Sequence, residues 1–212
     1  MAARTPRSVG TPLQRQLAGT ATARPSAVDA FRQARRTFLA GERIDMQALA
    51  KQLNIDRATL YRWVGSREQL LTEILWSLIA QTVETLRTNH VGGGPPATAG
   101  ESVAAEIVIG AVRSVIANTG MQRFLDREGD LALRLLTTKA TDFQARLVHL
   151  ITQLVHEEAS AGRLNATIPI DDLPYVLVRI MESYTYLGLI TGEHPDPDRA
   201  ARVVNALLPI SR

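Results

Sequence analysis

Cysteine is absent from this chain of 212 residues, which excludes a disulfide framework. The absence fits the reducing cytoplasm, and we therefore expect a cytoplasmic protein. Long apolar segments are absent too. No run approaches the roughly 18 residues that suggest a membrane span, so we expect no membrane partner.

Catalytic and cofactor motifs are also missing. The sequence has no nucleophile elbow, no His-Glu-x-x-His and no paired-carboxylate motif. The glycines at 92–94 precede no Gly-Lys-Ser/Thr, so they do not form a phosphate loop. Asp142, His149 and His156 follow one another at seven-residue intervals, about 10 Å along a helix, which is too far for one metal ion. We expect no enzyme activity, no cofactor and no metal.

Charge is distributed unevenly along the chain, although the formal net charge is only +3. Residues 1–70 hold 12 basic and 5 acidic side chains, a net charge of +7. The remainder holds 12 basic and 16 acidic side chains, a net charge of −4. This asymmetry indicates that the first part attracts polyanions and the second does not.

Two short helices and the start of a third are predicted between residues 41 and 71. Asp45 and Asp56 can each cap a helix, because a carboxylate accepts hydrogen bonds from the free N–H groups at a helix start. Asn54 lies before the second cap and suits a left-handed turn. Ser66, with a glutamine three residues later, has the spacing of a capping box.

The second of these helices, predicted over residues 57–64, carries side chains that suit DNA. Two short helices joined by a tight turn are typical of a helix-turn-helix motif. An arginine such as Arg62 can pair bidentately with guanine, and Thr59 and Tyr61 can bind phosphates or bases. A helical hairpin with a solvated basic face is the alternative.

The motif resembles the DNA-binding domain of the TetR family of bacterial transcriptional regulators. The segments that carry the resemblance are Leu49-Ala50, Thr59-Leu60-Tyr61-Arg62-Trp63-Val64, Ser66-Arg67 and Leu70-Leu71. The resemblance implies two sets of DNA contacts. The base-contacting positions are Arg57, Thr59 and Arg62. The phosphate-contacting positions are Tyr61, Trp63 and Arg67, and Gln47 on the preceding helix is a further contact position.

The chain as a whole is predicted to be all-α. The expected helices span residues 26–40, residues 66 to about 89, and then 101–117, 121–136, 138–161, 171–191 and 197–208. Residues 91–100 form a Gly- and Pro-rich break. We divide the chain into a flexible basic arm (1–25), a helix-turn-helix DNA-binding domain of three helices (26–72) and a helical domain for ligand binding and dimerisation (73–212).

Residues 173–190 are apolar nearly all round the predicted helix, which indicates burial on two sides. In a domain of this size the second side is most simply a partner subunit. We therefore expect a homodimer formed through residues 171–208. The recognition helices of such a dimer must lie about 34–36 Å apart to enter successive major grooves of double-stranded operator DNA.

The second half resembles the QsdR-like branch of TetR regulators. The segments concerned include Phe124-Leu125-Asp126-Arg127-Glu128, Arg179-Ile180-Met181-Glu182-Ser183 and Ile190-Thr191-Gly192-Glu193-His194-Pro195-Asp196. This resemblance implies control of quorum-signal (lactone) degradation or of related small-molecule metabolism.

A ligand site is predicted from buried polar groups. Arg179, Glu182 and Tyr186 lie on one helix face, and a buried charge must be paired or meet a ligand. The alternative is a purely structural Arg–Glu pair. Four further candidates could line a cavity or be plain core: Trp76, Met121, Phe124 and Phe143.

These observations predict a TetR-type transcriptional repressor that a small, mostly apolar ligand releases from its operator, a lactone-like compound being one candidate. Two alternatives stay open: a constitutive or activating DNA-binding regulator without a ligand, and a helical protein that sequesters small molecules.

Overall fold

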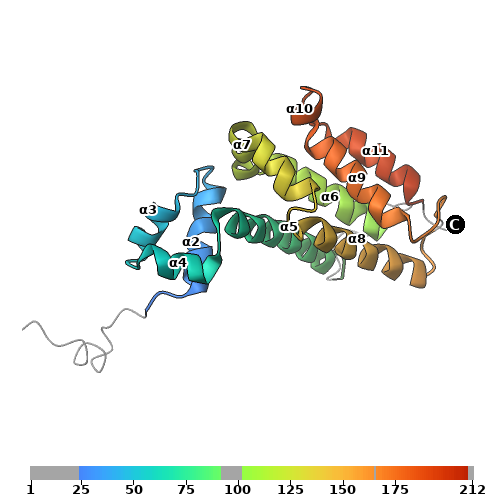
Figure 1. Ribbon diagram of the computed structural model, residues 1–212. Helices are drawn as coiled ribbons and strands as arrows, with labels where there is room; N and C mark the ends of the chain where they lie inside the picture. Colours follow the sequence, from blue (N-terminus) through green and yellow to red (C-terminus); the bar gives the residue numbers. More distant parts are fainter. Residues whose placement is uncertain (1–23, 92–101, 165, 210–212) are drawn as a thin grey trace, which may run out of the picture.

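The computed structural model describes residues 24–91, 102–164 and 166–209 (Figure 1). Within these ranges the chain forms ten α-helices and no β-strand, which confirms the all-α prediction. The helices are α2 (Ala27–Leu39), α3 (Met46–Gln52), α4 (Arg57–Val64), α5 (Arg67–Val91), α6 (Val103–Ala117), α7 (Thr119–Thr137), α8 (Phe143–Ser160), α9 (Leu173–Thr185), α10 (Leu187–Ile190) and α11 (Pro197–Leu207). The predicted arm falls largely, and the predicted break almost entirely, outside the described residues.

The molecule is elongated, with α2, α3 and α4 at one end and the larger helical bundle at the other (Figure 1). Helix α5 connects the two parts. It packs against α2 and α4 near its start and against α6 further along. A displacement at one end of this single helix therefore reaches the other end.

Local capping signals determine where the first helices begin, as predicted for Asp45 and Asp56. Ser26 forms a capping box with Asp29 at the start of α2, and Asp45 and Asp56 accept backbone N–H bonds at the starts of α3 and α4. These hydrogen bonds hold the pKa values of Asp45 and Asp56 below the ordinary range. Asn54 has a φ of 53°, the left-handed conformation expected of the turn between α3 and α4.

Two of the predicted helix spans are wrong in detail. The span 138–161 begins only at Phe143, because the Thr138 hydroxyl donates to Arg134 O at 2.6 Å and accepts from Ala140 N at 3.1 Å. These bonds close α7 and start a turn. The span 171–191 is interrupted at Tyr186, whose φ and ψ of −102° and 18° end α9 before the short α10.

Helix α9 uses most of its apolar surface inside its own subunit. Leu173, Leu177 and Val178 are fully buried, whereas Tyr175 and Ser183 are exposed on the outward side. One side of the helix is thus buried as predicted, whereas the burial of the outward side by a partner subunit stays a prediction.

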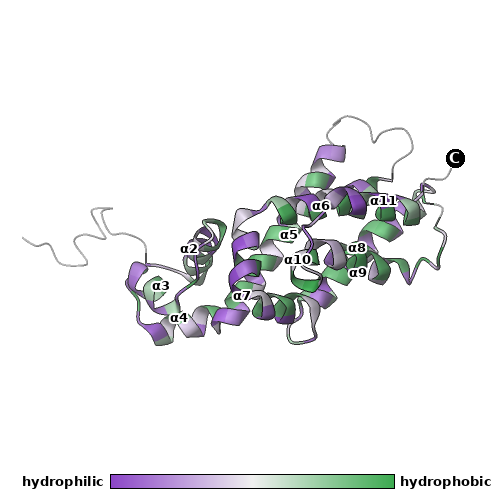
Figure 2. Cartoon of the chain, turned by 90° about the horizontal axis from the view of Figure 1, so that it is seen from above, coloured by the Kyte–Doolittle hydropathy of each residue, from purple (hydrophilic) through white to green (hydrophobic). Residues whose placement is uncertain are grey.

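The hydrophobic core extends through the larger bundle. Hydrophobic and hydrophilic stretches follow one another along each helix of the bundle (Figure 2). In the described part of the chain no single helix is long and apolar enough to cross a membrane. Helices α6 and α7 meet that length and composition only together, with a bend of 68° between them.

Candidate functional site

Helix α4 presents a polar outer face on a buried anchor. Leu60 is 0% exposed and fixes the helix in the small domain, whereas Arg57, Tyr61 and Arg62 are exposed. The Arg57 guanidinium lies 5.9 Å from the centre of the Tyr61 ring. An exposed arginine and phenol on one short helix suit contact with DNA bases and phosphates.

The other predicted DNA contacts are placed less simply. Gln47 is exposed at the start of α3. Thr59 donates its hydroxyl to the Asp56 carboxylate at 2.7 Å, so this hydroxyl already has an acceptor. Trp63 is half-buried against the core. Arg67 points toward the larger bundle and not outward, as its partners below indicate. The DNA roles of all seven residues stay predictions.

Arg67 joins the small domain to α7. Its two terminal nitrogens donate to the two Glu128 carboxylate oxygens at 2.8 and 2.6 Å, and its Nε donates to Ile44 O at 2.8 Å. The Arg67 and Glu128 side chains are only 20% and 17% exposed. Helix α7 leaves helical geometry at Glu128, with φ −136° and ψ 42°. The distortion coincides with the residue that holds Arg67.

Further contacts fix α7 against the loop after α2. Arg123 donates to Ala40 O and Arg127 to Gly41 O, each at 3.0 Å. Gly120 allows the closest approach, because a Cβ there would lie 2.3 Å from Phe38 O. Such a distance is far below van der Waals contact, so only glycine fits at position 120 without a shift of α7 or α2.

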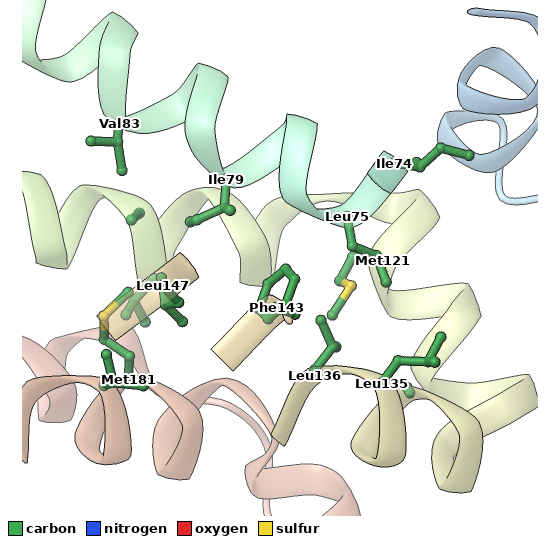
Figure 3. Close-up of a cluster of buried hydrophobic side chains, with 14 of the residues drawn as sticks. Ile74, Leu75, Ile79, Val83, Met121, Leu135, Leu136, Phe143, Leu147 and Met181 are labelled. Atoms are coloured by element: carbon green, nitrogen blue, oxygen red, sulfur yellow. The ribbon is translucent and has the colours of Figure 1, made fainter. Parts of the chain in front are cut away.

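A cavity of about 350 Å³ lies inside the larger bundle, between α5, α6, α7, α8 and α9. Its walls are mainly apolar. Figure 3 shows Leu75 and Ile79 of α5 on one side, Phe143 and Leu147 of α8 in the middle, and Met181 of α9 opposite. Helix α7 contributes Met121 and Leu136 near its two ends. The volume is within the usual range of ligand sites, about 300–1,000 Å³.

Four of the seven predicted ligand residues line this cavity: Met121, Phe143, Glu182 and Tyr186. The other three do not. Trp76 is not in the lining and packs edge-on against Phe143, which lines the cavity. The Arg146 guanidinium lies 4.4 Å from the centre of the Trp76 ring. Phe124 packs edge-on against Phe38 between the domains, with ring centres 5.7 Å apart.

Arg179, the third, lies behind the cavity wall. It pairs with Glu182 through Nη1 at 3.0 Å and donates to Gln144, which in turn donates to Glu182. Burial raises the pKa of Glu182, and the Arg179 charge and the Gln144 hydrogen bond oppose this rise. Burial likewise raises the pKa of Tyr186, which stays a neutral phenol. The polar end of the cavity is therefore a neutralised pair beside a protonated hydroxyl.

Sequence reasoning missed the polar residues of α5, α6 and α9 in the lining, among them Gln81, Thr82, Ser114 and Thr185. A signal existed for one of them, because Thr82 interrupts the otherwise apolar stripe of α5. The remaining positions depend on how five helices come together, which no local pattern records.

The larger helical bundle, the helix-turn-helix and the cavity are together typical of one class of bacterial transcriptional regulator with two domains. Residues 99–209 match the tetracyclin repressor-like C-terminal domain, and the chain therefore belongs to the TetR family. No curated protein sequence matches the chain.

Among solved structures the chain is similar to the R. erythropolis transcriptional repressor QsdR, at 27% identity and a TM-score of 0.69, over 86% of this chain and 93% of that one. This similarity confirms the predicted QsdR-like resemblance. A candidate TetR family regulator from Shewanella sp. PV-4 is 15% identical over 89% of this chain and 100% of that one, with a TM-score of 0.48.

Proposed function

We propose that the protein is a repressor that binds operator DNA as a homodimer and leaves it when a small molecule enters the cavity. The small domain, residues 26–72, holds the DNA-contacting side chains, and residues 73–212 hold the ligand site and the dimer interface. The similarity to QsdR, which is a repressor, favours repression over activation.

The observation that carries the proposal is that cavity and small domain share two helices. Helix α5 lines the cavity from Leu75 to Leu86 and begins at Arg67 inside the small domain's packing. Helix α7 lines the cavity at Met121 and Leu136 and, between them, holds Arg67 through Glu128. A ligand that separates these helices changes the position of α4 relative to the bundle.

A second contact joins the α2 helix to the cavity rim. Arg35 donates to the Gln81 side chain at 2.5 Å, and Gln81 is one of the cavity residues. This bond links the two domains about four helical turns beyond Arg67 along α5. Ligand binding is thereby coupled to the small domain through α2 as well as through Arg67.

The DNA-binding part is tested with Arg62→Ala, which removes an exposed guanidinium from α4 without touching the buried face. We expect the substitution to weaken binding to operator DNA more than binding to random DNA, because one bidentate base contact contributes about 1–3 kcal/mol of discrimination. Arg32, exposed on α2, supplies the matched control. Equal losses on both DNAs would assign Arg62 to a phosphate and contradict base contact.

The dimer is tested on the outward sides of α9 and α11. Ile180 and Leu207 are apolar and keep part of their surface exposed in the single chain. We expect Ile180→Asp with Leu207→Asp to sediment as a monomer and to lose operator binding, whereas Ser183→Asp, at an exposed polar position, keeps the dimer. A wild-type monomer at micromolar concentration would sink the proposal, and a dimeric double variant would move the interface elsewhere.

A further inference from the structure

Most hydroxyl groups of the cavity lining lack the carbonyl bond that other helix hydroxyls form, the exception being Thr85, which donates to Gln81 O at 2.8 Å. Thr72, Thr88 and Thr152 each donate to the carbonyl four residues earlier, at 2.8–2.9 Å. Among the described residues, no protein acceptor serves the hydroxyls of Thr82, Ser114, Thr185 or Tyr186, and all four residues line the cavity. Thr185 and Tyr186 are only 6% and 7% exposed.

The hydroxyls of Thr185 and Tyr186 are not among the fully enclosed side-chain atoms that lack a partner, so each can receive one, water or a ligand, from the cavity. Thr185 and Tyr186 follow Glu182 by three and four residues at the end of α9, a spacing that places all three on one side of the helix, and all three line the cavity. Two donors and one acceptor therefore meet at this end. They suit a head group that offers a carbonyl oxygen to the hydroxyls and an N–H to the carboxylate.

The charge of the lining restricts the head group further. Glu182 is the one acidic residue of the lining, and the lining contains no lysine, arginine or histidine. Its counter-charge, Arg179, is not part of the lining. It is bonded to Glu182 and Gln144, and its Nε is enclosed by protein without a hydrogen-bond partner. An anionic head would thus meet a carboxylate in a low-dielectric site, with no cation in the lining to receive it.

The remaining surface suits an alkyl or acyl chain. The α5 stretch that lines the cavity, Leu75 to Leu86, is about 16 Å long by helix rise. The residues that face this stretch across the cavity are mainly apolar. The exposed lining residues Gln81, Thr85 and Ser114 belong to α5 and α6, and we place the opening of the cavity between these two helices. The chain of a ligand can therefore lie along the apolar walls, between that opening and the polar end.

We propose that the cavity selects an uncharged N-acyl amide or a related amphiphile whose head both donates and accepts hydrogen bonds, held by Thr185, Glu182 and Tyr186. This inference rests on the proposed ligand site, and it names the chemistry of the ligand. It excludes carboxylates and other anions as tight ligands.

Three compounds of equal chain length separate the possibilities: octanamide (neutral, donor and acceptor), methyl octanoate (neutral, acceptor only) and octanoate (anion). Binding is measured by calorimetry on the full chain without DNA. We expect octanamide to bind at least about tenfold more tightly than methyl octanoate, the effect of one hydrogen bond to a charged group. Octanoate should bind most weakly of the three.

Variants assign the roles. Thr185→Val should weaken the amide and the ester alike, whereas Glu182→Gln should weaken the amide and reduce the discrimination against octanoate. Ser183→Ala is the matched control, because Ser183 lies on the same helix, is exposed and donates to Arg179 O at 2.8 Å. Thermal melts of each variant verify that it is folded.

The inference is overturned if octanoate binds as tightly as octanamide. It is also overturned if methyl octanoate and octanamide bind with equal affinity. If none of the three binds, the hydroxyls are served by water and the inference is wrong. DNA release is assayed separately. Selective amide binding without release would leave the ligand class standing and refute the proposed ligand-gated repressor.

Discussion

The link between Arg67 and Glu128 allows a quantitative test of how the two domains are joined. The perturbation is a double-mutant cycle with Arg67→Ala, Glu128→Ala and the double variant. A second pair provides the control, because Glu68 and Arg134 also join α5 to α7 through two hydrogen bonds, at 2.7 and 3.2 Å. The two pairs share their helices and differ in burial.

The expected magnitude follows from that burial. Arg67 and Glu128 are 20% and 17% exposed, against 50% and 47% for Arg134 and Glu68. Hydrogen bonds to charged groups contribute about 1.5–3 kcal/mol when water is largely excluded. We therefore expect a coupling energy of about 1.5–3 kcal/mol for Arg67–Glu128, and for the exposed pair a coupling close to experimental error.

Urea unfolding at low salt measures all seven proteins of the two cycles, which share the wild type, because guanidinium chloride would screen the charges. The Nε bond from Arg67 to Ile44 O is lost in both variants that lack Arg67, so it cancels from the coupling. A coupling for Arg67–Glu128 no larger than that of the exposed pair would refute the claim that burial makes this link the stronger one.

The same variants decide whether Arg67 also meets DNA. If Arg67 exchanges Glu128 for a phosphate in the complex, Arg67→Ala should reduce the salt dependence of DNA binding by about one phosphate contact. Glu128→Ala, which leaves the guanidinium without its carboxylate, should raise DNA affinity. An unchanged salt slope in Arg67→Ala would make this residue a domain link only.

Two further predictions concern stability. Gly120→Ala should destabilise the protein by about 1–3 kcal/mol in urea unfolding, because its Cβ would lie 2.3 Å from the α2 backbone. Gly188→Ala, whose Cβ meets nothing nearer than 3.6 Å, should not, and equal effects would contradict the close approach. Burial raises the pKa of Glu182, so the folded state binds its proton more tightly, and stability should fall as pH rises from the ordinary value of 4.5 through the raised pKa. Glu182→Gln should remove this part of the pH dependence, and an unchanged profile would show that Glu182 titrates normally.

Local chemistry made the small domain predictable. The caps at Ser26, Asp45 and Asp56 and the left-handed Asn54 depend on residues within a few positions of each other. The bundle was predictable as helices, yet the interruption at Tyr186 has no proline or glycine at the break itself to announce it.

The cavity was predictable only in part, because it depends on packing between helices. Aromatic residues were favoured as lining, but Trp76 lies behind the wall and Phe124 joins the domains. Small hydroxyl residues such as Thr82 and Thr185 line the cavity instead. Thr82 and Thr185 lack a bond to the carbonyl four residues earlier, whereas Thr85, which also lines the cavity, makes one, and the sequence does not record this difference.

The bonds that hold the loop after α2 come from side chains of α5 and α7, and they affect which parts of the small domain can change in sequence. Three arginines, Arg67, Arg123 and Arg127, bind main-chain carbonyls of residues 40–44. A carbonyl is the same whatever side chain its residue carries, so the two helices beyond the loop can accept new side chains while these three bonds persist. Within the loop Gly41 is restricted, because its φ is 72° and a Cβ there would lie 2.2 Å from Arg123 Cδ. On the proposed function, we therefore expect that exchanging residues 46–64 for those of a relative redirects the repressor to another operator and leaves its proposed response to ligand unchanged.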